Sequence, residues 1–140
     1  MTDWIRHQHP STSPELLGVL QLAWLGDAVW ELHQRLRRCK KAGKAKDLHV
    51  AVVSEVKAEA QSNALFVLEK FLLEDEMNFV RKGRNKAGKS PRNINPSIYG
   101  RATGFETMVG WLFLKNPTRL ASLFDLLEER ESDKSLKKGL

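Results

Sequence analysis

The chain has 140 residues, of which 41% are hydrophobic and 29% are charged, a balance typical of one folded domain rather than a disordered chain. No apolar run approaches the roughly 20 residues that cross a bilayer, and the first residues lack the apolar segment of a secretory signal, so we expect a cytoplasmic protein, or a stromal one in a plastid. The single cysteine, Cys39, excludes an internal disulfide, and the net charge of +6 favours a polyanionic partner.

Helical periodicity dominates the chain, and no segment sustains the alternation of apolar and polar residues that a strand shows. Ser13, Pro14 and Glu15 combine a capping hydroxyl, a proline and an acid, which together predict a helix start. Gly18 separates this turn from a longer helix that fades at a basic segment, residues 35–46. Further helices are expected over residues 47–53, 54–71, 74–82, 96–115 and from 117 onward. The pattern predicts an all-α domain at 14–130, with an N-terminal extension at 1–13 and a flexible charged tail at 131–140.

A second basic segment, residues 81–92, contains neither an acid nor an aromatic residue. It also contains two glycines, a serine and a proline, which interrupt helices, so we interpret it as a mobile basic loop rather than a helix face. Such a loop either contacts a polyanion or only adds solubility. Its candidate contact residues are Arg81, Lys82, Arg84, Asn85, Lys86, Lys89 and Arg92. The first basic segment is equally compatible with a contact surface and a solvated helix end.

Two carboxylates lie inside otherwise apolar helical segments: Asp27 within residues 23–30 and Glu106 within residues 104–111. A buried ionised carboxylate is costly unless a cation, a metal or several donors compensate it, so these acids are candidates for a site. Glycine inside a helix costs about 1 kcal/mol relative to alanine, so Gly26 and Gly110 indicate that two helices cross closely and bring the acids together. Carboxylate oxygens suit Mg²⁺. Alternatively, each acid lies at the edge of its apolar stripe and reaches solvent or a neighbour such as Arg101.

The segments around both acids carry a family resemblance. Leu-Gly-Asp-Ala-Val at 25–29 matches the signature helix of the ribonuclease III endonuclease family, and Phe-Glu-Thr-Met-Val-Gly at 105–110 resembles its second acidic helix. Residues 22–31, 53–61 and 81–85 more specifically resemble Mini-ribonuclease III, the short branch of that family that ends after the catalytic domain. The resemblance extends over most of the chain.

This resemblance implies a helical homodimer in which Asp27 and Glu106 hold a catalytic metal, with one active centre per subunit along an RNA groove. It implies Mg²⁺-dependent hydrolysis of double-stranded RNA to 5′-phosphate and 3′-hydroxyl ends, with maturation of precursor 23S ribosomal RNA as the characteristic task. Because no further domain fits into the residues available, segment 81–92 is then expected to contact the RNA. Ribosomal proteins are candidate additional partners.

The sequence departs from the full-length members of that family at two positions. Those enzymes carry a Glu one turn before the signature Asp and an Asp three residues before the second Glu, where this chain has Ala23 and Thr103. The short branch is itself poor in these acids, so the number of metal ions stays open. Candidate accessory residues are Glu31, Tyr99 and Thr103. Glu31 either contributes to the site or the dimer, or is solvated or salt-bridged.

Two competing interpretations remain at the level of sequence. The main one is a non-catalytic helical module that binds RNA or associates with the ribosome. The other is an unrelated helical adaptor whose basic patches bind acidic proteins. Retention of both Asp27 and Glu106 favours the enzyme, because loss of activity usually lets such acids drift.

Overall fold

A computed structural model of the chain describes residues 10–40 and 54–138. Its elements, in chain order, are the 3-10 helix η1 (Pro14–Leu16), α1 (Val19–Arg38), α3 (Ser54–Leu68), the 3-10 helix η2 (Glu69–Phe71), α4 (Glu74–Lys86), α5 (Pro96–Lys115) and α6 (Pro117–Lys138). No strand occurs within these two ranges, and the predicted all-α fold is confirmed. None of the helices in the described part of the chain has the apolar length that crossing a lipid bilayer requires.

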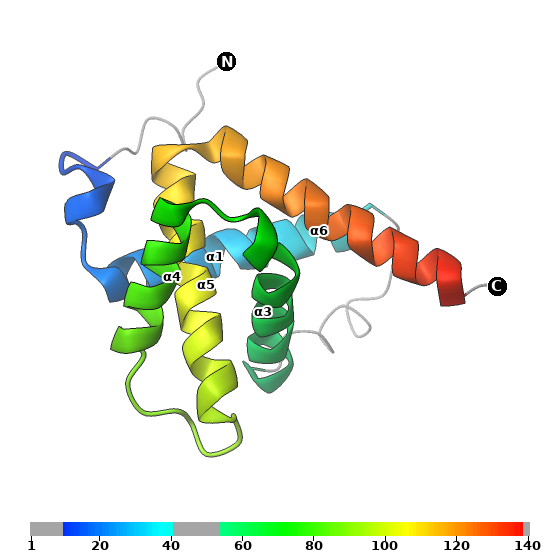
Figure 1. Cartoon of the computed structure of the whole chain (residues 1–140), viewed down its shortest axis with the longest axis horizontal. Coiled ribbons are helices and arrows are strands. Elements are labelled where there is room, and N and C mark those ends of the chain that lie inside the picture. Colours follow the sequence, from blue (N-terminus) through cyan, green and yellow to red (C-terminus); the bar gives the residue numbers. More distant parts are fainter. Residues whose placement is uncertain (1–9, 41–53, 139–140) are drawn as a thin grey trace.

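Helix α5 is the central element of the fold. It packs against α1, α3, α4 and α6, with α3 and α4 on either side of it and α1 behind it in Figure 1. The sequence explains this position, because residues 102–105 and 107–112 of α5 are all buried and a helix that is apolar on every side has to be enclosed. Asn95 begins the helix: its side chain accepts a hydrogen bond from the backbone N–H of Ser97 at 2.8 Å, and Pro96 follows as the first helical residue.

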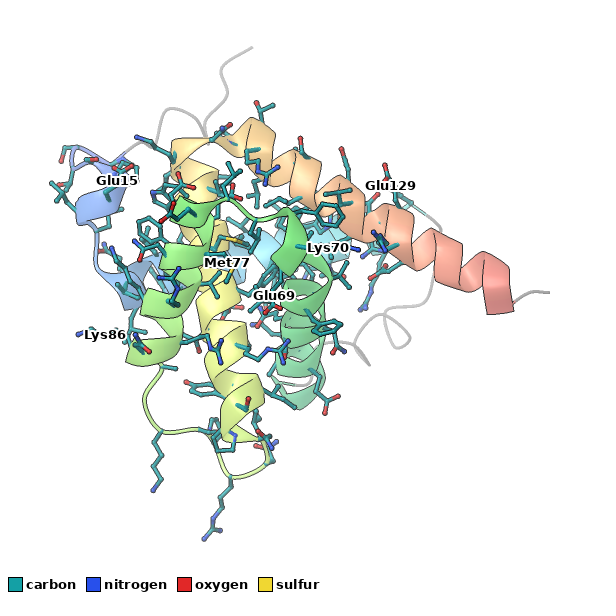
Figure 2. All side chains as sticks on the ribbon, in the orientation of Figure 1. Glu15, Glu69, Lys70, Met77, Lys86 and Glu129 are labelled. Carbon is teal, nitrogen blue, oxygen red and sulfur yellow. The ribbon has the colours of Figure 1, made fainter. Side chains whose placement is uncertain are left out.

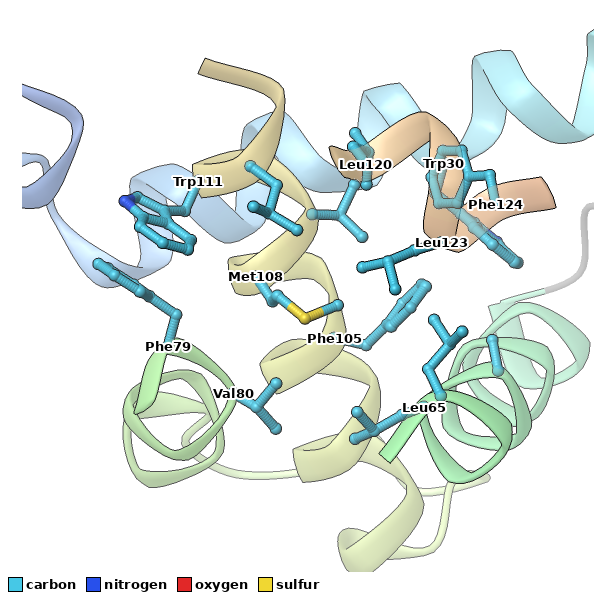
Figure 3. Packing of buried hydrophobic residues seen from close by; sticks show 14 of the residues in the cluster. Trp30, Leu65, Phe79, Val80, Phe105, Met108, Trp111, Leu120, Leu123 and Phe124 are labelled. Carbon is cyan, nitrogen blue, oxygen red and sulfur yellow. The ribbon is translucent and has the colours of Figure 1, made fainter. Parts of the chain in front are cut away.

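The core forms where α5 meets its neighbours. Phe105 and Met108 are fully buried at its centre, and the ring of Trp30 from α1 packs edge-on against Phe105 with centroids 5.1 Å apart. On the opposite side, Phe79 of α4 stacks on Trp111 at a centroid distance of 4.4 Å. Figure 3 shows Trp30 and Phe79 reaching from α1 and α4 toward Phe105, Met108 and Trp111 of α5. This enclosure fixes α5 rigidly relative to α1.

A buried ion pair ties α4 to α6. Glu76 is only 1% exposed, and its carboxylate accepts hydrogen bonds from the guanidinium of Arg119 at 2.9 and 3.0 Å. The same guanidinium donates to the carbonyl of Phe71 at 2.7 Å. Burial alone would raise the pKa of Glu76, but these hydrogen bonds, the Leu73 N–H and the charge of Arg119 lower it. This acid therefore has a structural partner in Arg119.

The interpretation of residues 81–92 as a loop is wrong for its first half, because α4 continues to Lys86. The reason is the packing of Gly83 against α5: a Cβ built on Gly83 would lie 2.4 Å from Oγ1 of Thr107 and 2.7 Å from Cα of Gly104. Gly83 therefore serves close helix packing and does not end the helix. Only residues 87–95 connect α4 to α5, and Gly88 there has a φ of 72°.

Other expected elements differ in detail. The 3-10 turn η1 and α1 are separated at Gly18 as predicted. In the expected helix at 54–71, the apolar spacing of Val56, Ala60 and Ala64 predicts a buried stripe, which is wrong at Ala60 because this residue is exposed, while Gln61 and Leu65 are buried. Residues 131–138, assigned from sequence to a tail, are the last turns of α6. The expected helix at 47–53 lies outside the described residues.

Candidate active site

Helices α1 and α5 cross at a distance that only glycine permits. A Cβ built on Gly26 of α1 would lie 1.8 Å from the backbone oxygen of Glu106, and one built on Gly110 of α5 would lie 2.0 Å from the backbone oxygen of Leu22. Real Cβ atoms do not approach other atoms this closely, so each helix needs a glycine where the other backbone passes. The close crossing expected from Gly26 and Gly110 is confirmed.

This crossing brings together the two acids singled out from the sequence. Asp27 follows Gly26 directly, and the backbone of Glu106 is the group that Gly26 faces. The two carboxyl groups lie close enough for the charge and a hydrogen bond of Asp27 to raise the pKa of Glu106. The alternative of an acid at the edge of its stripe holds in part for Asp27, whose side chain is 37% exposed and pairs with Lys57. Arg101, the neighbour considered for Glu106, instead reaches the carbonyl of Ser62 at 3.4 Å.

The electrostatics of Glu106 reflect this contact. Burial raises its pKa first, and the negative charge and hydrogen bond of Asp27 raise it further, to about 8. The positive charge of Lys57 and a hydrogen bond from Gln61 act in the opposite direction. Without a metal, Glu106 therefore holds its proton near neutral pH.

Lys57 is a component of the site that sequence reasoning missed. Its ammonium group forms an ion pair with Asp27 and another with Glu31, the latter at 2.9 Å. Burial favours the neutral amine, but the hydrogen bonds and charges of the two acids outweigh it, and the pKa of Lys57 is raised. One signal was available in the sequence: Lys57 is the only basic residue of α3 and lies within residues 53–61, one of the segments that carry the family resemblance.

The donor set of the crossing fits a hard divalent cation. Asp27 and Glu106 present carboxylate oxygens from two rigidly packed helices, and such oxygens are the protein ligands that Mg²⁺ prefers. A cation between the acids would also remove the repulsion that raises the pKa of Glu106. Within the described ranges no cluster of three or more metal-ligating side chains occurs. Water and substrate oxygens would therefore have to complete the coordination.

The accessory candidates occupy different surroundings. Glu31 is held by Lys57 and so lies beside the acid pair. Thr103 is buried and donates its hydroxyl hydrogen to the carbonyl of Tyr99 at 2.9 Å. Tyr99 packs against a small apolar cluster that includes Ile94. Glu31 therefore lies at the site, where Lys57 links it to Asp27. The hydroxyl of Thr103 is instead engaged in a hydrogen bond within α5.

All seven candidate contacts of the basic segment are exposed. Five of them lie on the last turns of α4, namely Arg81, Lys82, Arg84, Asn85 and Lys86, and two lie in the connection to α5, namely Lys89 and Arg92. Figure 2 shows Lys86 at the outer edge of the molecule near the end of α4. The basic surface is therefore a helix end continued by a loop. In the other basic segment, Arg37 and Lys40 pair with acids of α6.

The raised pKa of Glu106 predicts how the metal-free protein responds to pH. The pKa of Glu106 is about 8 in the folded protein against an ordinary value of 4.5, so the folded state binds more protons than the unfolded state between these values. The free energy of unfolding should therefore fall as the pH rises from about 4.5 to about 8. Glu106→Gln should remove this contribution and melt at or above the wild-type temperature at pH 8.5 in EDTA, as thermal unfolding monitored by circular dichroism would show. A marked drop in melting temperature would instead identify Glu106 as a structural partner.

Comparisons with known proteins agree with this arrangement. The family model described as the Ribonuclease III domain matches residues 20–117. A Mini-ribonuclease 3 from Synechococcus sp. is 43% identical over 110 residues, which cover 79% of this chain and 80% of that protein. A Mini-ribonuclease 3 from Kosmotoga olearia is 37% identical over 136 residues, covering 96% of this chain and 92% of the relative.

A solved structure shares the fold. A crystal structure of a Fusobacterium nucleatum protein superposes with a TM-score of 0.75 at 25% identity, covering 86% of this chain and 99% of that one. The family model spans α5 and the crossing of α1 with α5, which are the elements that carry both acids. The chain therefore belongs to the ribonuclease III family of endoribonucleases, in its Mini-ribonuclease 3 branch.

Proposed function

We propose that this endoribonuclease cleaves double-stranded RNA with Mg²⁺ held by Asp27 and Glu106, leaving 5′-phosphate and 3′-hydroxyl ends. The observation that carries this proposal is the convergence of two carboxylates at a glycine-mediated helix crossing. Family membership already implies a divalent metal. The choice of Mg²⁺ rests on the donor set, which consists of carboxylate oxygens, the protein ligands that Mg²⁺ prefers.

The residues of the chain prepare the site in three ways. When bound, the ion supplies Lewis-acid activation of the attacking water and neutralises charge on the phosphate. Asp27 and Glu106 would hold the ion, and Glu106 would be ionised there because a nearby cation stabilises its carboxylate. Gly26 and Gly110 fix the spacing of the two acids, since both backbones are locked at the crossing. Because α5 is packed on all sides, the two carboxylates keep their positions when negative charge develops on the phosphate during hydrolysis.

RNA contact is assigned to the basic surface formed by the end of α4 and residues 87–95. Its cationic side chains are exposed, and no acid interrupts residues 81–92. Arg84 and Asn85 are proposed to make close contacts, and Lys86, Lys89 and Arg92 looser ones with phosphates. Affinity from such contacts depends on shape more than base sequence and falls steeply with salt.

A homodimer is proposed through α1, in keeping with the dimerisation of the family. Trp24 is 78% exposed and Leu20 is 51% exposed, and the two lie one helical turn apart on α1. Leu16 in the preceding turn is 77% exposed. Large apolar side chains aligned on one exposed face usually mark an interaction surface. A second copy placed there would supply a second acid pair to one RNA duplex.

The natural substrate is proposed to be precursor 23S ribosomal RNA, processed in the bacterial cytoplasm or the plastid stroma. The resemblance to the Mini-ribonuclease 3 branch supports this choice of substrate. Ribosomal proteins are proposed as partners because they bind the same precursor.

Cleavage of a long RNA duplex tests the proposed function. We expect the purified protein with Mg²⁺ to shorten the duplex, to leave single-stranded RNA of the same sequence uncut, and to stop completely on addition of EDTA. The products should be joined by RNA ligase without phosphorylation, because their 5′ ends carry phosphate. Binding without cleavage would support the RNA-binding module, and failure to bind or cleave would support the adaptor.

A further inference from the structure

The ammonium group of Lys57 lies beside Asp27, at the place where the catalytic metal is expected. A positive charge is needed there because two carboxyl groups lie close together. Its ammonium group pairs with Asp27, the acid that also contacts Glu106. Two carboxylates in contact repel one another, and Lys57 is the cation whose charge opposes the resulting rise in the pKa of Glu106. The side chain of Lys57 is 21% exposed, so water screens its pairing only in part.

Glu31 gives Lys57 a second anchor. It lies one helical turn after Asp27 on α1, and its carboxylate accepts a hydrogen bond from Lys57 at 2.9 Å. Lys57 can therefore leave Asp27 without becoming an unpaired, half-buried charge. This matters because an unpaired buried ion costs much more than a pair that exchanges one partner for another.

We propose that Lys57 is a built-in counter-ion that stands in for the metal at Asp27 and is retained by Glu31 when a divalent cation binds. This inference rests on the proposed function, since it assumes that the cation binds at Asp27 and Glu106. Lys57 then stabilises the metal-free fold and competes with the metal. Glu31 acts as a positioning residue through Lys57 and not as a metal ligand.

Replacing the lysine by an uncharged side chain of similar length tests the competition directly. In Lys57→Met, Mg²⁺ binding measured by titration calorimetry at pH 8.5 without RNA should tighten by about tenfold, which corresponds to ~1.4 kcal/mol. The melting temperature in EDTA should fall, and its rise on adding Mg²⁺ should exceed that of the wild type. The matched control is Lys115→Met, which removes a lysine paired with Glu15 at 2.9 Å and should leave Mg²⁺ affinity unchanged.

A double-mutant cycle with Glu31→Gln separates competition from a general charge effect. In the wild-type background Glu31→Gln should weaken Mg²⁺ binding, because Lys57 loses its second anchor and holds Asp27 more firmly. In the Lys57→Met background the same change should have little effect. Equal weakening in both backgrounds would show that Glu31 acts on the metal itself and would overturn the proposed role of Lys57.

The outcomes distinguish this inference from the proposed function. If the wild type binds Mg²⁺, loses it in Asp27→Asn and shows the same affinity in Lys57→Met, the metal site stands and the counter-ion role is overturned. If the wild type binds no Mg²⁺ even with duplex RNA present, both fail. Should Lys57→Met not fold, Glu31→Gln alone still decides, since unchanged Mg²⁺ affinity in that variant contradicts the inference.

Discussion

Replacing Asp27 by asparagine is expected to reduce cleavage of duplex RNA by at least about a thousandfold, equivalent to ~4 kcal/mol in the activation barrier. Asparagine preserves the shape of the side chain but removes the charge that holds a divalent ion. It also leaves Glu106 as the only acid of the pair, while Lys57 keeps its hydrogen bond to Glu31. The loss should therefore concern chemistry and metal affinity rather than folding.

Cleavage rates at saturating RNA, together with RNA affinity and molecular mass in solution, provide the measurement for Asp27→Asn. RNA affinity and dimer mass should stay close to those of the wild type, because Asp27 belongs to neither the exposed basic surface nor the exposed apolar face of α1. Asp125→Asn is the matched control, since Asp125 is exposed on α6 and should be neutral. Near wild-type cleavage by Asp27→Asn would mean that Asp27 is not a ligand.

Adding one methyl group at Gly26 is expected to destabilise the fold by at least about 3 kcal/mol, or to lower the melting temperature by roughly 10 °C or more. The new Cβ would meet the backbone oxygen of Glu106 at 1.8 Å, and also the backbone nitrogen of Gly110 at 2.9 Å. Backbone atoms cannot turn away as a side chain can, so α1 and α5 would have to separate. Chemical denaturation of Gly26→Ala, followed by helical circular dichroism, measures the effect.

Gly100→Ala is the control for this effect. Gly100 also lies within α5, but a Cβ built on it would have no neighbouring atom within 4 Å. Alanine there should stabilise the protein by ~0.5–1 kcal/mol, because it lowers the entropy of the unfolded chain and favours the helix. If both substitutions stabilised the protein, the close crossing of α1 and α5 would be wrong.

The sequence predicts well those features for which one residue, an acid or a glycine, stands out within an apolar helical pattern. Asp27 and Glu106 were identifiable because charged residues interrupt apolar helices, and Gly26 and Gly110 because glycine has no local reason to be there. Both signals indicate the same contact, so the crossing of α1 and α5 could be inferred from the sequence alone. The all-helical fold followed in the same way from the absence of strand periodicity.

The sequence did not reveal features that depend on a partner residue in a distant part of the chain. Lys57 looks like an ordinary surface lysine in its own helix, and its role emerges only when α3 packs beside α1 and its acids. Residues 81–86 looked like a loop because Gly83 suggested a break, but α5 supplies the surface that this glycine packs against. Glu76 and Arg119, which pair with each other, are likewise 43 residues apart in the sequence. Local patterns carry no information on such partners.

The central claim is that Asp27 and Glu106 hold one divalent ion between α1 and α5. Crystals grown with Mn²⁺ and duplex RNA, with data collected at the manganese absorption edge, test this claim most directly. We expect an anomalous density peak within coordination distance of both carboxylates, with Lys57 turned toward Glu31. A peak elsewhere, or an intact ion pair between Lys57 and Asp27 beside bound RNA, would contradict it.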